Sequence, residues 1–267
     1  MSLNNIDNEP KNLGLGSGTL QNVKKIFDLG GAGDLLAVKD ISFSFTGGEI
    51  ISLLGPSGCG KTTVLKMIGG LIKATSGEIR VSGSSVNGPY ENVGMVFQTP
   101  TLMPWRSVLS NIKFPLEVLN KQLHGIEEKA ASLLDVTNLT EFNHAWPHEL
   151  SGGMQQRVAL CRALIHSPEI LLMDEPFGAL DELTRMEMND LLLKIKYQEK
   201  NTVIFVTHSI SEAIYLSDTV HVFSKRPAEI KKTIAIDLPH PRKPADRYTD
   251  DFKKLELDAG EALGVIR

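Results

Sequence analysis

The fold is decided by the stretch Gly55-Pro56-Ser57-Gly58-Cys59-Gly60-Lys61-Thr62, which has the phosphate-loop spacing G-x-x-x-x-G-K-[ST]. The apolar run Ile50–Leu54 enters it as a buried strand, and residues 63–68 leave it as a helix. The glycines let backbone N–H groups close around phosphate oxygens, and the positive end of the helix dipole points at the same anion. Lys61 offers an ammonium to the β- and γ-phosphates, and Thr62 a hydroxyl to Mg²⁺. The stretch predicts a nucleoside-triphosphate site that consists of Gly55, Pro56, Ser57, Gly58, Cys59, Gly60, Lys61, Thr62 and Thr63.

Polar residues follow three further apolar strands at their carboxyl ends. Gln98 follows residues 93–97, the pair Asp174-Glu175 follows residues 169–173, and His208 follows residues 202–206. Ligand groups of an open α/β sheet lie at the carboxyl ends of its strands. We therefore expect Gln98 to offer a carbonyl oxygen to Mg²⁺ or to a water, and Asp174 to hold that ion directly or through water. Glu175 is suited to take a proton from the attacking water, and His208 to bond to the γ-phosphate.

Ser151-Gly152-Gly153 predicts a second anion-binding helix start. Ser151 is a helix cap, and the helix continues through Leu164 to the break at Pro168. The remaining histidines have no comparable placement and receive no role (positions 124, 144, 148, 166, 221 and 240).

Two aromatic residues are open to two interpretations each. Phe27 ends a strand over residues 20–27, where it either stacks on an adenine ring or packs in the core. Trp105 lies between Pro104 and Arg106, where it is either an anchor for a binding partner or packing for its own segment.

The length, composition and charge limit the classes of protein to which the chain can belong. The 267 residues, 42% of them hydrophobic, have room for one large domain or one domain with an inserted subdomain. The formal net charge of −4 provides no basic field for nucleic acid, so we expect no nucleic-acid partner. There is no apolar run of about 18 residues and no apolar signal segment at the N-terminus. Cys59 and Cys161 lack metal-ligand spacing and fit a reducing compartment.

Three segments follow from the pattern along the chain. Residues 1–18 are rich in Asn, Gly and Ser and are expected to form a flexible tail. Residues 19–238 are expected to form one α/β domain in which about residues 99–165 are an inserted helical subdomain. Residues 239–267 are expected to be a Pro-rich linker and a closing helix over residues 247–263, with Phe252, Leu255 and Ala259 on one face. Further strands are expected at 36–45, 77–81, 219–223 and 229–236, and further helices at 110–119, 126–134 and 182–197.

Taken together, these motifs resemble the ATP-binding cassette (ABC) ATPases over nearly the whole chain. The phosphate loop, Gln98, the stretch 150–157, Asp174-Glu175, Ala179-Leu180-Asp181 and His208 match the family's motifs in order. The resemblance implies an α/β fold with a P-loop NTPase core: a mixed sheet flanked by helices, antiparallel N-terminal strands and an inserted helical subdomain. It also implies adenine stacking by Phe27 and a nucleotide contact by Asp181. Met154 departs from the family's commonest signature, which has Gln there.

Within the family, the chain resembles the energising subunit of importers for nitrate, sulfonate, taurine or bicarbonate. The stretch Leu102-Met103-Pro104-Trp105-Arg106, the Met154 signature and the short Pro-rich tail carry this likeness. It implies ATP and Mg²⁺ as ligands, an integral membrane permease as partner and, indirectly, an extracytoplasmic solute-binding protein. It also implies a peripheral position on the cytoplasmic face of the inner membrane.

The chain has two predicted phosphate-binding helix starts but one complete nucleotide site, and a two-fold dimer would explain this. Each ATP would lie between the phosphate loop of one chain and Ser151-Gly152-Gly153 of the other, which is also what the resemblance implies. The second chain is either a second copy or a related ATPase subunit. A soluble ABC-type ATPase that acts as an assembly scaffold without a permease is the alternative function.

Overall fold

The structure is a computed structural model, which describes residues 14–120 and 124–266. The strands are β1 (Gly18–Asp28), β2 (Asp34–Phe45), β3 (Ile50–Leu54), β4 (Ser76–Val81), β5 (Ser84–Ser85), β6 (Val93–Val96), β7 (Ile170–Asp174), β8 (Thr202–Thr207), β9 (Thr219–Phe223) and β10 (Ala228–Ala235). The α-helices are α1 (Lys61–Ile68), α2 (Val108–Val118), α3 (Ile126–Val136), α4 (Gly152–Leu164), α5 (Glu182–Glu199), α6 (Ile210–Leu216) and α7 (Asp250–Leu263). Short 3₁₀ helices cover Gly30–Ala32, Thr140–Phe142, Pro147–Glu149 and Pro244–Tyr248.

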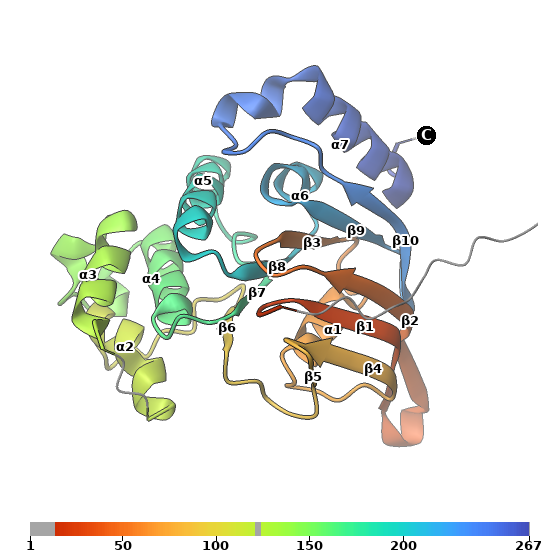
Figure 1. The fold of residues 1–267 in the computed structure, drawn as a ribbon, viewed down its shortest axis with the longest axis horizontal. Helices are drawn as coiled ribbons and strands as arrows, with labels where there is room; N and C mark the ends of the chain where they lie inside the picture. The colour runs from red at the N-terminus through yellow and green to blue at the C-terminus, as the bar shows by residue number, and fades with distance from the viewer. Residues whose placement is uncertain (1–13, 121–123, 267) are drawn as a thin grey trace, which may run out of the picture.

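The strands of the described residues form one ten-stranded sheet in the order β5-β4-β1-β2-β10-β9-β3-β8-β7-β6 (Figure 1). From β9 to β6 the neighbouring strands run parallel, whereas β1, β2, β4 and β5 pair antiparallel. Strand β10 joins the two parts, because it is parallel to β2 and antiparallel to β9. This is the mixed α/β sheet with antiparallel N-terminal strands that the resemblance implies.

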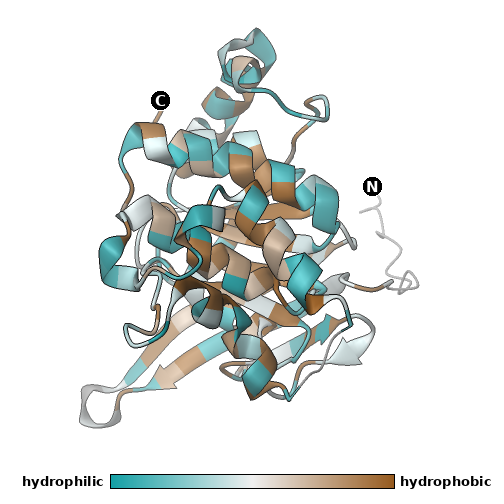
Figure 2. Ribbon diagram, turned by 90° about the vertical axis from the view of Figure 1, so that its left-hand side faces the viewer, coloured by the Kyte–Doolittle hydropathy of each residue, from teal (hydrophilic) through white to brown (hydrophobic). Residues whose placement is uncertain are grey.

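The central strands are buried on both faces. In β3, Ile51 and Leu53 contribute to a core cluster that also includes α1, while Ile50 and Leu54 contribute to a second cluster with the helices of the other face. Every position of β3 is therefore buried, four of the five by apolar residues, as expected for a strand between two layers. Figure 2 shows the same layering, with brown strands behind helices on which teal and brown alternate.

Helices α2, α3 and α4 lie together beyond the edge strand β6 (Figure 1). Ser107 caps α2 by accepting a hydrogen bond from the amide of Ser110 at 3.3 Å, which explains why the helix begins before the predicted residue 110. The predicted limits of an inserted subdomain at about 99–165 remain a prediction. In the described part of the chain, no helix has both the length and the apolar character to cross a membrane.

Several predicted boundaries are wrong, and two short elements were not predicted. Strand β5 has two residues, too few for a pattern. Helix α6 begins with the capping pattern Ser209-x-x-Glu212, a signal that is present in the sequence. Helix α4 ends at Leu164, not at Pro168, and the last helix begins at Asp250 after a 3₁₀ turn.

The flexible tail predicted for residues 1–18 extends too far, because its last residues belong to the folded domain. Residues 1–13 lie outside the described residues, but Gly16 to Gly18 are buried. The hydroxyl of Thr202 donates to the carbonyl of Gly16 at 2.6 Å, which attaches this entry segment to the sheet. Both cysteines are buried free thiols, and burial raises the pKa of Cys161 to about 12.

Candidate active site

The phosphate loop is pressed against the strands that surround it. Gly60 has φ +123°, and a Cβ there would lie 2.9 Å from the carbonyl oxygen of Ala37 and 3.0 Å from the Cβ of Ala228. Only glycine fits such a backbone at such a distance. The neighbouring Gly58 also has a positive φ of 72°. This curvature, held between β2 and β10, is the kind that forms a concave nest for an anion.

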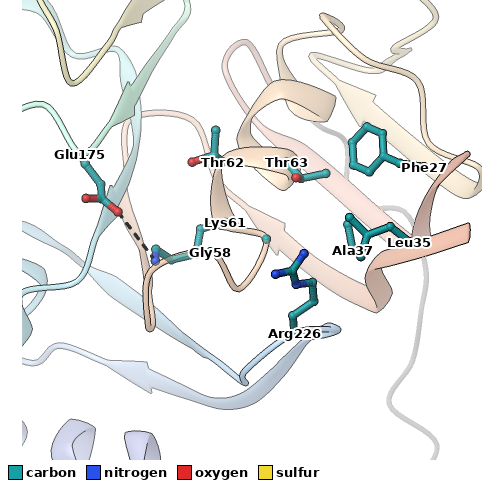
Figure 3. Close-up of a pocket in the computed structure, with 10 residues that line it drawn as sticks. Phe27, Leu35, Ala37, Gly58, Lys61, Thr62, Thr63, Glu175 and Arg226 are labelled. Atoms are coloured by element: carbon teal, nitrogen blue, oxygen red, sulfur yellow. Dashed lines mark ion pairs between the residues drawn. The ribbon is translucent and has the colours of Figure 1, made fainter. Parts of the chain in front are cut away.

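Lys61 points into this loop and is only 3% exposed (Figure 3). Its ammonium donates to the carbonyl oxygens of Gly55 at 2.7 Å and Pro56 at 3.0 Å, and lies 4.0 Å from Glu175 Oε1. Two of these partners are neutral carbonyls. A phosphate oxygen would form a stronger, charge-assisted hydrogen bond with the ammonium, so the site is suited to a polyanion.

Thr62 and Asp174 meet at the place predicted for the metal. The Thr62 hydroxyl donates to Asp174 Oδ1 at 2.7 Å. Burial, and to a smaller extent the charge of Glu175, raises the pKa of Asp174, so a nearby cation would favour its ionised form. The described residues contain no group of three or more His, Cys, Asp or Glu side chains placed to hold a metal. A hard cation such as Mg²⁺ fits these oxygen donors if phosphate oxygens and waters complete its shell.

Glu175 and His208 are in contact. His208 Nδ1 lies 3.1 Å from Glu175 Oε2, and 54% of the His208 side chain is exposed. The backbone of Glu175 has φ +44°, and its amide donates to Val206 at 3.0 Å. Gln98 is also near, because a Cβ on Gly178 would lie 3.5 Å from the Gln98 amide nitrogen and 3.8 Å from Glu175 Oε2. The carboxyl ends of three strands thus bring together Gln98, Glu175 and His208.

A cavity of about 180 Å³ lies beside the loop. Phe27 lines it, which places this ring at the cavity and not in the interior of the core (Figure 3). The Lys25 ammonium lies 4.9 Å from the centroid of the Phe27 ring. The cavity is lined by Phe27, Leu35, Ala37, Gly58, Gly60, Lys61, Thr62, Thr63, Glu175 and Arg226.

Three of these lining residues, Leu35, Ala37 and Arg226, were not predicted from the sequence. Leu35 is the pairing partner of Phe27 in the β1–β2 ladder, so correct pairing of the two predicted strands identifies it. Arg226 lies in the loop between β9 and β10, and no local motif singles it out. Among the predicted loop residues, Cys59 is buried in the core, so it offers the cavity no side chain.

Other predicted residues lie away from this cavity. Ser151 caps α4 by accepting a hydrogen bond from the amide of Met154 at 3.3 Å, and Gly152 and Gly153 form the first turn of that helix. Asp181 caps α5: its two carboxylate oxygens accept from the amide and the hydroxyl of Thr184, which lowers the pKa of Asp181. Figure 1 shows α4 well to one side of α1. Within one chain, Ser151 and Lys61 do not share a site.

The buried carboxylate of Glu212, in the helix that follows His208, was also not predicted from the sequence. Thr207 Oγ1 donates to Glu212 Oε2 at 2.6 Å, and the other oxygen of Glu212 lies 4.0 Å from Arg185 Nε. Arg185 donates in turn to the carbonyl of Leu180 at 2.7 Å, next to Asp181. Burial raises the pKa of Glu212. These contacts connect the strand end that precedes His208 with the turn that leads to Asp181.

Known proteins resemble this chain over most of its length. Residues 38–178 match the family described as ABC transporter. An uncharacterized ABC transporter ATP-binding protein of Methanocaldococcus jannaschii is 46% identical over 87% of this chain and 86% of its own length. The aliphatic sulfonates import ATP-binding protein SsuB of Bacillus cereus is 40% identical over 86% of this chain and 90% of that protein.

A solved structure agrees with the sequence relatives. The ATP-binding cassette MJ0796, described as a dimer in a post-hydrolysis state bound to ADP and Pi, matches with a TM-score of 0.72 and 32% identity. The match covers 83% of this chain and 100% of that cassette. The fold, the phosphate loop with its two acids and these likenesses agree, and the chain belongs to the ABC transporter family as one of its ATP-binding ATPases.

Proposed function

We propose that this chain is the ATP-hydrolysing subunit of an importer that takes up a small anion of the aliphatic sulfonate type through a separate membrane permease. The observation that carries the proposal is the 40% identity to a sulfonate import ATP-binding protein over 86% of the chain. Such a subunit would lie peripherally on the cytoplasmic face of the inner membrane and depend indirectly on an extracytoplasmic solute-binding protein. Nitrate, taurine and bicarbonate are the competing solutes.

The residues in the cavity and at the strand ends beside it would have separate roles in hydrolysis. Lys61 would exchange its carbonyl partners for the β- and γ-phosphates, and Glu175 would take a proton from the attacking water. His208, in contact with Glu175, would orient that carboxylate and bond to the γ-phosphate. Mg²⁺ held by Thr62, Asp174 and Gln98 would neutralise charge that develops on the phosphate oxygens.

The separation of Ser151 from Lys61 supports a head-to-tail dimer. In such a dimer Ser151, Gly152, Gly153 and Asp181 of one chain would complete the nucleotide site of the other. The related cassette MJ0796 is described as a dimer with ADP and Pi, which supports the same arrangement. ATP would hold the two chains together, and hydrolysis would release them.

The segment from Phe97 to Arg106 is proposed to contact the permease. Gln156 of α4 donates to the carbonyl of Phe97 at 3.1 Å, and Arg162 donates to the carbonyl of Thr101 at 2.9 Å. Trp105 is 71% exposed, which favours the partner-anchor interpretation over packing. The segment lies between Gln98 and the helix that begins at Ser151, and is therefore suited to carry a change at the nucleotide to the membrane partner.

The proposal is tested by transport. The tagged chain is purified from its native membranes with its permease, reconstituted in vesicles and given ATP and radiolabelled alkanesulfonate, nitrate, taurine or bicarbonate. ATP-dependent uptake of the alkanesulfonate above the other three supports the proposal. Selective uptake of another solute overturns the substrate class. A chain that hydrolyses ATP without any associated permease supports the scaffold function instead.

A single substitution tests the coupling segment. We expect Trp105→Ala to lower permease-stimulated ATPase activity and uptake at least tenfold and to leave the basal ATPase activity of the isolated chain unchanged. Tyr248→Ala is the matched control, because Tyr248 is an aromatic residue of almost equal exposure, 72%, in a different part of the chain. If Trp105→Ala and wild type have equal permease-stimulated ATPase activity and uptake, Trp105 is not part of the permease contact.

A further inference from the structure

Arg226 is a cation that lines the cavity although it lies outside the phosphate-loop motif. It lies in the loop between β9 and β10 and lines the same cavity as Phe27 and Lys61 (Figure 3). Within the described residues, it has no hydrogen bond and no ion pair. A guanidinium without a partner beside an anion-binding loop is available to bind an anion.

The loop that presents Arg226 is held firmly against the phosphate loop. The Ser224 hydroxyl donates to the carbonyl oxygens of Lys225 at 2.7 Å and Pro227 at 2.9 Å, and accepts from the amide of Glu229 at 3.0 Å. A Cβ on Gly55 would lie 3.0 Å from Phe223, and one on Gly60 would lie 3.0 Å from Ala228. Residues on both sides of Arg226 therefore lie against the phosphate loop, so the backbone that carries Arg226 is in place before a ligand arrives.

The residues that line the cavity with Arg226 indicate which part of a nucleotide it would meet. Ala228, two residues after Arg226, pairs with Val38 of β2, and Arg226 lines the cavity together with Leu35 and Ala37 of the same strand (Figure 3). Leu36 and Leu35 pair with Ile26 and Phe27 of β1. In the sheet, β2 lies between β1, which carries Phe27, and β10, which follows the loop of Arg226. Arg226 is thus on the Phe27 side of the phosphate loop.

We propose that Arg226 binds the α-phosphate of the nucleotide and sets the affinity for ATP and ADP equally. The inference rests on the proposed placement of the base at Phe27 and of the β- and γ-phosphates at Lys61. The ribose and the α-phosphate join these two parts; the α-phosphate is the anionic one, and a planar guanidinium can donate two hydrogen bonds to its oxygens. Because the α-phosphate is unchanged by hydrolysis, Arg226 contributes to binding and not to the rate of the chemical step.

Arg226→Gln, Arg226→Lys and Lys225→Gln test the proposal in the full-length chain. Dissociation constants for MgATP and MgADP are measured by calorimetry, together with steady-state ATPase kinetics. Arg226→Gln should weaken both nucleotides about tenfold and raise KM to the same extent, with kcat unchanged. Arg226→Lys should recover part of the affinity. Lys225→Gln removes the same charge from an exposed neighbour that does not line the cavity, and should stay within twofold of wild type.

Each contrary result has a distinct meaning. Wild-type affinity for both nucleotides in Arg226→Gln overturns the proposal, as does an equal loss in Lys225→Gln, which would show a general effect of charge. A loss for ATP alone would overturn the assignment to the α-phosphate. If Lys61→Ala binds ATP as tightly as wild type, the nucleotide site itself is misplaced, and this result separates failure of the proposed function from failure of Arg226. Unchanged melting temperatures verify that the variants are folded.

Discussion

Glu175 combines an uncommon backbone conformation with the position proposed for the catalytic base. A φ of +44° is rare for a residue with a side chain, and such conformations cost roughly 1–3 kcal/mol. The hydrogen bond from the Glu175 amide to Val206 and the pairing of Asp174 with the same residue in the β7–β8 ladder hold the conformation. Strain that neighbouring structure maintains is found preferentially at functional sites, which supports the role proposed for Glu175.

His221 gives a prediction for stability against pH. The residue is 3% exposed in β9, its Nδ1 lies 2.9 Å from Thr233 Oγ1, and its Nε2 is buried without a partner. Burial lowers the pKa of His221 to about 4, so the folded chain keeps the imidazole neutral while the unfolded chain protonates it near pH 6.5. The contribution of His221 to stability is therefore complete above pH 6.5 and is lost as the pH falls to about 4.

The measurement is the free energy of unfolding in urea between pH 7 and pH 4. We expect wild type to lose up to about 3 kcal/mol from this residue over that range. His221→Gln lacks this loss. The difference in the free energy of unfolding between wild type and variant should therefore narrow by that amount between pH 7 and pH 4. His144→Gln, at an exposed position, is the matched control for the substitution itself. A constant difference for His221→Gln would show that the imidazole is not held neutral.

At the scale of elements, one buried side chain shapes the segment that precedes α2. Asn111 has no exposed surface; its amide nitrogen donates to the carbonyls of Met103 at 3.1 Å and Arg106 at 2.9 Å. Its carbonyl oxygen accepts from the Met103 amide at 2.8 Å. These bonds fix the turn that exposes Trp105, so the proposed permease contact depends on Asn111 for its shape.

Asn111→Ala leaves these backbone groups without their partner. We expect the free energy of unfolding to fall by about 2–3 kcal/mol, because buried groups that lose a hydrogen bond keep their full cost of desolvation. Chemical denaturation measures this change, with Asn87→Ala as a control at an exposed position in a loop. A change below about 0.5 kcal/mol for Asn111→Ala would show that water replaces the lost bonds.

Continuous motifs were predictable because each reports its own local geometry. A strand, a glycine loop and a capped helix follow one another at residues 50–68, and the same holds for Asp174-Glu175 at the end of β7. The structure brings Lys61, Thr62, Asp174, Glu175 and His208 together as that pattern indicates. The α/β class followed from the same pattern, whereas the mixed sheet was implied by the resemblance to the ABC ATPases.

Contacts that depend on sheet register were not predictable from the sequence. Arg226 reaches the cavity because β10 pairs with β2, a pairing between residues almost two hundred positions apart. Glu212 and Arg185 come together through packing between helices α5 and α6. Neither feature has a local signal in residue type or spacing, because register is fixed by the assembled sheet and the core.

At the scale of the whole molecule, the two predicted phosphate-binding helix starts of one chain lie apart. Lys61 and the cavity lie beside α1, whereas Ser151 begins α4 at the other side of the sheet. Two copies related by a two-fold axis would pair each helix start with its complement in the other chain and form two equal sites. ATP would then be the ligand that stabilises the dimer, by mass action.

Light scattering after size-exclusion chromatography of Glu175→Gln with MgATP tests this arrangement most directly. Without the proposed base, hydrolysis should slow at least a hundredfold, so bound ATP should persist. The variant should elute at twice the mass of one chain with one ATP per chain, and at the mass of one chain with MgADP. Elution as a single chain with ATP bound, or ATP turnover at the wild-type rate, would contradict the account.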